Sequence, residues 1–305
     1  MTLSVNPDAE IFLSNLQQIQ ARISTAERQL SSGLRVSVAS DAPDQVSGIL
    51  QLRAQIAGVQ QTQQNLSSVT PQVESAENAI QQAIQVLDTA TSLATQAAGS
   101  TSSASQRMDL VPQVQGILQQ LVSLSQTSVG GQYIFSGDQG GQPQYVMAAN
   151  GNSVQQMTQP GPPGQIEDAN GVKITFGLTA QQIFDDQDVN GNPTTANVFA
   201  AVTGLLTALQ TNNTADIQTA VTNIQTASAH LNDESSFYGA AQNNLTAAGN
   251  QASQTVVQLQ QELSNEQDAD VAQASLALTT GNTDLQAAMA SQAMLKPQSL
   301  FSYLG

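Results

Sequence analysis

The residue types that most often perform chemistry in proteins are nearly absent from this sequence. Its 305 residues include one histidine, His230, and no cysteine. A cysteine nucleophile, a disulfide and any metal site of the His/Cys type are therefore excluded by count. His230 precedes Leu231 in a helical pattern and stands off its apolar row, so we interpret it as a solvated or half-buried side chain rather than a catalytic base.

One acidic loop begins with the residue pattern of a calcium-binding site. Asp186-Gln187-Asp188-Val189-Asn190-Gly191 matches the first six positions of an EF-hand loop, but Asn197 stands where the twelfth position needs a bidentate glutamate. Because Asx and Gly residues also form ordinary turns, we favour a plain loop over a calcium site. Glu74 and Glu77 share a helix face and are interpreted as solvated. The sequence thus predicts no catalytic residue, no cofactor and no metal.

The charge balance excludes two classes of partner. The chain carries 7 basic and 23 acidic residues, for a net charge of −16. Nucleic acid and anionic membrane surfaces both require clusters of Lys and Arg, so neither is expected. The sequence contains no run of 18 apolar residues, so no segment is expected to span a bilayer. Residues 1–7 lack a basic segment and an apolar segment, so we expect no cleavable signal peptide.

Apolar residues recur with coiled-coil spacing in the first half. A first series stops before Gly33, which can cap a helix, and a second recurs every seven residues from Leu52 to Ala94. Pro71 must kink or restart this second helix, and the unbroken heptad phase favours a kink. A third helix is expected at about 104–127. The first series comprises Phe12, Leu16, Ile19, Ile23, Ala26 and Leu30.

The second half mirrors the first. Apolar residues recur every seven positions from Ile217 to Leu259, and a shorter helix follows the capping segment 268–270. Neither terminal helix can bury its apolar stripe alone, so we expect the two ends to pair. The stripe of the last helix comprises Val271, Ala274, Leu278, Leu285, Ala288, Met289 and Leu295.

Between these halves the periodicity disappears and Gly and Pro concentrate, with short β-type runs at 133–135 and 172–176. We therefore predict a mainly α fold: a long antiparallel, coiled-coil-like helical rod built from both chain ends, with a small β-rich inserted domain in the middle. The expected division has three parts. Terminal helices occupy 1–43 and 266–305, the helical rod occupies 44–130 and 200–265, and the β-rich inserted outer domain occupies 131–199.

Two segments resemble the bacterial flagellin family. Arg28-Gln29-Leu30-Ser31-Ser32-Gly33-Leu34-Arg35-Val36, followed by 39–44, is similar to its N-terminal signature. Segments 268–272 and 298–304 resemble its C-terminal helix. Residues 131–137, together with 300–304, are closer to the members that join hook to filament than to the filament subunit. The resemblance covers roughly 1–130 and 200–305.

This resemblance implies a structural flagellar protein, exported unfolded to the cell exterior, whose terminal helices order on assembly. It implies a homo-oligomer in a helical or ring assembly, with a hook-side junction protein, flagellin and an export chaperone as partners. A filament subunit remains the alternative within the family. Outside it, the alternatives are a calcium-dependent binding module or enzyme in the insert, and a free coiled-coil protein. The expected assembly interface comprises Phe12, Leu16, Ile19, Ile23, Leu30, Arg35, Val271, Leu278, Leu285, Met289, Leu295, Leu300 and Phe301.

Overall fold

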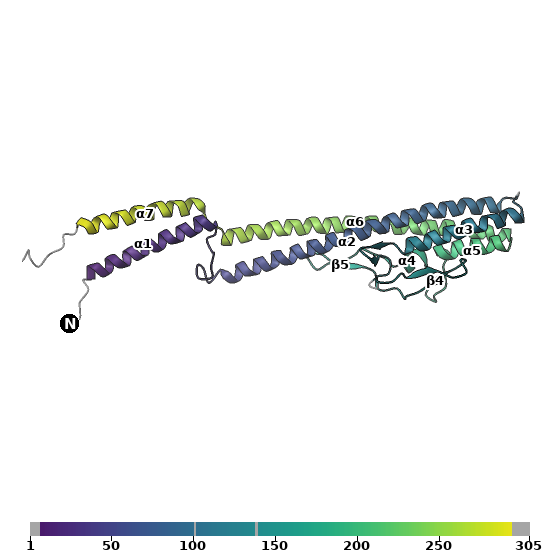
Figure 1. Cartoon of the computed structure of the whole chain (residues 1–305), viewed down its shortest axis with the longest axis horizontal. Coiled ribbons are helices and arrows are strands. Elements are labelled where there is room, and N and C mark those ends of the chain that lie inside the picture. The colour runs from purple at the N-terminus through teal and green to yellow at the C-terminus, as the bar shows by residue number, and fades with distance from the viewer. Residues whose placement is uncertain (1–6, 101, 138–139, 295–305) are drawn as a thin grey trace, which may run out of the picture. The chain divides into compact units, whose positions relative to one another are not determined.

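The computed structural model describes residues 7–100, 102–137 and 140–294 of the chain (Figure 1). The chain divides into two compact units, one made of residues 1–58 with 256–305 and the other of residues 59–255. The first contains α1 (Pro7–Ser32) and α7 (Val271–Met294). It also contains residues 46–58 of α2 (Val46–Ala98) and residues 256–267 of α6 (Thr214–Gln267).

The terminal helices α1 and α7 begin and end at residues suited to those positions. Gly33 follows α1 with φ of +71°, where a side chain would be strained, and its N–H donates to the carbonyl of Gln29. The Asp270 carboxylate accepts the N–H groups of Ala272 and Gln273 at the start of α7, at 2.9 and 3.1 Å. Figure 1 shows the two helices side by side, which confirms the expected pairing of the chain ends.

The second unit contains residues 59–98 of α2 and 214–255 of α6, together with α3 (Ala104–Ser125) and α5 (Val198–Gln210). Helix α2 continues through Pro71 for 53 residues, so the helix does not restart there. Ser103 and Gln106 form a capping box that begins α3, and the Asn197 side chain accepts the Ala200 N–H to begin α5. Local capping chemistry therefore sets where the shorter helices begin.

A buried arginine at the start of α3 forms hydrogen bonds to the end of α2 and to the turn between α5 and α6. Arg107 is 8% exposed, and its Nε donates to the carbonyl of Ala97 in the last turn of α2, at 2.9 Å. Its Nη1 donates to Oδ1 of Asn212 at 2.7 Å, in the turn between α5 and α6. The guanidinium thus lies at the C-terminal end of α2, where the helix dipole favours a positive charge.

Three separate antiparallel hairpins lie between α3 and α4 (Ala180–Phe184) in the described part of the chain. Gly130 and Gly131 both have positive φ and form the two-residue turn of the first hairpin. The strand expected at 172–176 is confirmed, whereas the one expected at 133–135 is wrong beyond Tyr133. The strands are β1 (Ser128–Val129), β2 (Gln132–Tyr133), β3 (Tyr145–Met147), β4 (Val154–Gln156), β5 (Gln165–Glu167) and β6 (Lys173–Thr175).

The reason for the short β2 is burial. Phe135 is fully buried and meets Phe184 edge to face, with ring centroids 5.7 Å apart. Phe184 in turn stacks on Phe199 of α5. These rings belong to one continuous apolar core that includes α2, α3, α5 and α6. The segment 131–199 therefore shares the core of the helices rather than enclosing a core of its own.

Candidate assembly surface of the terminal helices

The expected apolar stripes face each other only in part. On α1, Ile19 is buried, and Phe12, Leu16, Ile23 and Leu30 are half-buried. On α7, Leu278 and Leu285 are half-buried, whereas Val271 and Met289 remain 59% and 57% exposed. Arg35 is exposed and lies in the segment that follows α1. The other expected interface residues, Leu295, Leu300 and Phe301, lie outside the described residues.

The two helices approach each other closely at Gly281, a residue that the sequence pattern did not single out. A Cβ added at Gly281 would lie 2.8 Å from Cγ1 of Ile23. Gly281 is buried, as is Ala274 one heptad earlier, and Ala288 follows one heptad later. A small residue at every seventh position of α7 was the available signal. These small residues let the larger side chains of α1 approach the backbone of α7.

Charge adds little to this pairing. The guanidinium of Arg22 lies 3.4 Å from the carboxylate of Asp284, and both side chains are largely exposed. Exposed ion pairs of this kind contribute about 0–1 kcal/mol. Apolar packing around Ile23 and Gly281 therefore carries most of the stability of the pair.

Substantial apolar surface on the pair stays uncovered. Ile11 and Leu13 of α1, and Leu276, Met289 and Met294 of α7, are each more than half exposed. Beside Leu276 an open groove of about 570 Å³ runs between the two helices. It is lined by Ala21, Arg22, Thr25, Ala26, Gln29, Gln273, Leu276, Ala277 and Thr280. Exposed apolar patches on soluble proteins commonly mark interaction sites, so this face is the candidate assembly surface.

Backbone hydrogen bonds join the two segments that lead into the pair, which we call the crossover (residues 33–41 and 264–269). Leu34 and Asp268 form an antiparallel bridge. The Arg35 N–H donates to the carbonyl of Gln267 at 2.7 Å, and the Ala269 N–H donates to that of Gly33 at 2.9 Å. The Arg35 side chain also donates to the carbonyl of Glu266. Arg35, an expected assembly residue, thus has partners within its own chain.

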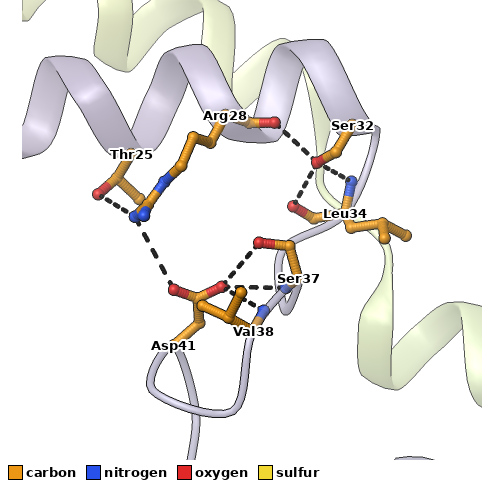
Figure 2. Close-up of polar contacts among 7 residues, drawn as sticks. All are labelled: Thr25, Arg28, Ser32, Leu34, Ser37, Val38 and Asp41. Carbon is orange, nitrogen blue, oxygen red and sulfur yellow. Dashed lines mark hydrogen bonds and ion pairs between the residues drawn. The ribbon is translucent and has the colours of Figure 1, made fainter.

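A carboxylate closes the loop of the crossover, as Figure 2 shows. Asp41 accepts the N–H of Ser37, the hydroxyl of Ser37 and the N–H of Val38, each at 3.0 Å. Arg28 lies 3.8 Å from its second oxygen. The hydrogen bonds from Val38 and Ser37 lower the pKa of Asp41, because they favour its charged form.

The serine that ends α1 completes this arrangement. Its hydroxyl, on Ser32, donates to the carbonyl of Arg28 at 2.7 Å and accepts the N–H of Leu34 at 3.1 Å (Figure 2). The chain direction after α1 is therefore fixed by short-range polar contacts. Three side chains of the segment 28–44 make these contacts: Ser32, Ser37 and Asp41.

The acidic loop at 186–191 has an ordinary structural role in the described chain. The Asp188 carboxylate accepts the N–H groups of Asn190 and Asn192 at 2.8 and 2.9 Å, and these bonds lower its pKa. Asn197, at the position of the missing glutamate, caps α5 instead. Among the described residues, no group of three or more His, Cys, Asp or Glu side chains could hold a metal ion. No helix among them is long and apolar enough to cross a membrane.

Comparisons with known proteins match both ends of the chain. The model of the bacterial flagellin N-terminal helical region matches residues 3–140, and that of the C-terminal helical region matches residues 214–304. Flagellin B from two strains of Helicobacter pylori is 29% identical over 140 residues, or 45% of this chain. The match spans only 27% of the length of each of those flagellins.

Several solved structures share the fold. A putative flagellar hook-associated protein from Vibrio parahaemolyticus has a TM-score of 0.62 and 17% identity, with 75% of this chain and 100% of that chain covered. Flagellar hook-associated protein-3 from Legionella pneumophila has a TM-score of 0.60 and 14% identity, covering 71% and 98%. FlgL from Xanthomonas campestris has a TM-score of 0.57 and 17% identity, covering 70% and 99%. At these identities the likeness concerns the fold.

Proposed function

Because this chain belongs to the bacterial flagellin family, we propose that it is a structural subunit of the flagellum that joins the hook to the filament, as a hook-associated protein 3. The proposal rests on the share of each relative's length that matches this chain. The hook-associated proteins resemble this chain over 98–100% of their own lengths. The flagellins match it over only 27% of theirs.

The surface of the terminal pair supports an assembly role. Its exposed apolar side chains and its open groove remain available to other subunits. We propose that copies of the chain pack in a ring or helical assembly through this face. The interface would include the expected residues of α1 and α7, with Leu295, Leu300 and Phe301 as further members. A hook-side junction protein and flagellin would be the axial neighbours, and an export chaperone would bind the chain before assembly.

We propose further that the protein works outside the cell and performs no chemistry. The described residues hold no metal-binding cluster, and the only histidine lies in a helix-to-helix contact rather than a cleft with a nucleophile. A role in bearing load between two axial structures needs packing rather than catalysis.

The filament subunit is the second candidate, favoured by the match to Flagellin B. A deletion strain separates the two roles. Loss of a junction protein should leave hooks in place while flagellin subunits are shed into the medium. Loss of the filament subunit should leave nothing to shed. Immunolabelling along the whole filament, instead of at the hook end, would overturn the junction assignment.

A point variant tests the assembly surface itself. Leu276→Asn changes a side chain that is 68% exposed on the groove, so the fold of the single chain should tolerate it. The matched control is Val172→Asn, which changes a similarly exposed side chain beside β6. Only the groove variant should fail to enter flagella, as scored by motility and by labelled flagella. Equal incorporation of both variants would contradict the proposed surface.

A further inference from the structure

All the sulfur in this chain belongs to methionine. The sequence contains six methionines, and it has no cysteine or tryptophan that would compete for an oxidant. An oxidant such as a peroxide converts the apolar thioether of methionine into a polar sulfoxide. The reaction requires contact between the oxidant and the sulfur atom, so the exposure of each methionine indicates how readily it reacts.

Two of the most exposed methionines lie on α7. Met289 is 57% exposed and Met294 is 82% exposed. In the other unit, Met108 of α3 and Met157 after β4 are 50% and 55% exposed. Met147 of β3 is half-buried and packs against the core. Accessible thioethers therefore occur both on the candidate assembly surface and far along the sequence from it.

The helical spacing places both methionines of α7 in rows of exposed apolar side chains. Met294 follows Leu276 by 18 residues, which is five turns of helix, so the two lie on the same side of α7. Leu276 is 68% exposed and lines the open groove beside α1. Met289 follows Val271, which is 59% exposed, by the same interval. Each row thus has a methionine near its C-terminal end.

Oxidation would make both rows polar. The sulfur lone pair attacks one oxygen of hydrogen peroxide, the O–O bond breaks, and the other oxygen takes the remaining hydrogen and leaves as water. The sulfur is oxidised and the peroxide is reduced. The new sulfoxide oxygen accepts hydrogen bonds from water in the free chain. A second copy that packed on this face would have to bury that oxygen among apolar side chains, which is unfavourable without a donor.

We propose that Met289 and Met294 form an oxidation site that controls assembly: the chain assembles while both are thioethers and fails to assemble once they are sulfoxides. This inference rests on the proposed assembly through α1 and α7. The site acts on the free chain, because a neighbouring copy on this face would shield the sulfur atoms from the oxidant. The fold of the free chain persists, since the buried contact between Ile23 and Gly281 contains no sulfur.

Peptide mass spectrometry of the full chain treated with hydrogen peroxide tests the reactivity. Met289 and Met294 should both be oxidised faster than the half-buried Met147. Circular dichroism should show unchanged helicity after the treatment. Oxidation of Met289 or Met294 more slowly than Met147 would overturn the proposal, as would a loss of helicity, which would mean that oxidation unfolds the chain.

Binding of labelled chain to cells that lack it but display hooks tests the consequence. After removal of the peroxide, treated chain should bind at least about tenfold less than untreated chain, because each sulfoxide buried without a donor is costly. The double variant Met289→Leu with Met294→Leu keeps both positions apolar without sulfur, so treatment should leave its binding unchanged. The matched control, Met108→Leu with Met157→Leu, removes two exposed sulfur atoms from the other unit and should remain sensitive.

The possible results separate this inference from the proposed function. Full binding of the treated chain would overturn the oxidation site and leave assembly through this face standing. Sensitivity that persists in the variant without Met289 and Met294 would also overturn it, because the responsible sulfur would lie elsewhere. Failure of the untreated chain to bind would contradict the proposed function itself, and the oxidation site with it.

Discussion

A methyl group added at Gly281 tests the contact that brings α1 and α7 together. The new carbon would lie 2.8 Å from Cγ1 of Ile23, whereas carbon atoms in contact prefer about 3.5–4.0 Å. Ile23 cannot easily swing aside, because a β-branched side chain on a helix has one strongly preferred rotamer. The helices must therefore separate or strain.

The magnitude combines two opposing effects. Overpacking of this kind costs about 1–3 kcal/mol, while replacing Gly by Ala within a helix gains about 1 kcal/mol. Gly281→Ala should therefore destabilise the pair by up to about 2 kcal/mol. Once Ile23→Ala has removed the obstructing atom, the same change should stabilise the pair by about 1 kcal/mol. The difference, a coupling of about 1–3 kcal/mol, isolates the close contact.

Amide exchange in residues 19–30 of the full chain measures this coupling across the four members of the cycle. The coupling corresponds to a change of about 5- to 150-fold in the opening equilibrium of α1. If Gly281→Ala increases protection equally in both backgrounds, the helices do not approach closely at this residue. If the unmodified chain shows no protection there, α1 and α7 do not pair within one chain.

Acidification should open the crossover. Hydrogen bonds from Val38 and Ser37 lower the pKa of Asp41, so its contribution to the stability of the crossover is fully present above the ordinary pKa of 3.8. That stability is lost as the pH falls through the lowered pKa of the folded chain. Exchange in residues 36–41 should show this dependence, and Asp41→Asn should abolish it. Arg107→Met should cost about 1.5–3 kcal/mol for each of its two hydrogen bonds, measured by urea denaturation. Replacing 131–199 by a short linker should lower the melting temperature of the remaining helices, since Phe184 shares their core; an unchanged melting temperature would argue for an independent insert. Calcium should bind no tighter than millimolar; micromolar binding by calorimetry, lost in Asp186→Ala, would contradict this.

Periodic features of the fold were predictable from the sequence, because a heptad is a local signal. The seven-residue spacing from Leu52 to Ala94 predicted α2, and the stripes at both ends predicted the pairing of α1 with α7. Gly33 also marked the end of a helix through its left-handed backbone, and Asp270 marked the start of one through its capping carboxylate. Each pattern behind these inferences is formed by residues within one or two turns of each other, and the pairing followed because two such stripes had no other partner.

Contacts between particular residues far apart in the sequence were not predictable. His230 meets a backbone carbonyl 48 residues away, and Arg107 meets Asn212 across 105 residues. Nothing in the local pattern of either residue identifies its partner, since tertiary packing alone brings them together. Gly281 was missed for a related reason: a glycine contributes no apolar side chain to a stripe, although its place in the heptad decides how closely the helices pack.

The crossover has a consequence for which substitutions the chain can accept. Its links from Arg35, Val36 and Ala269 are bonds between main-chain groups, and every amino acid except proline brings the same N–H to those positions. Sequence drift can therefore replace the side chains here while the connection between the two distant segments persists. Proline is the exception at all three positions, so these main-chain bonds tolerate any other residue, whereas the contacts of the Arg35 and Asp41 side chains are lost on substitution.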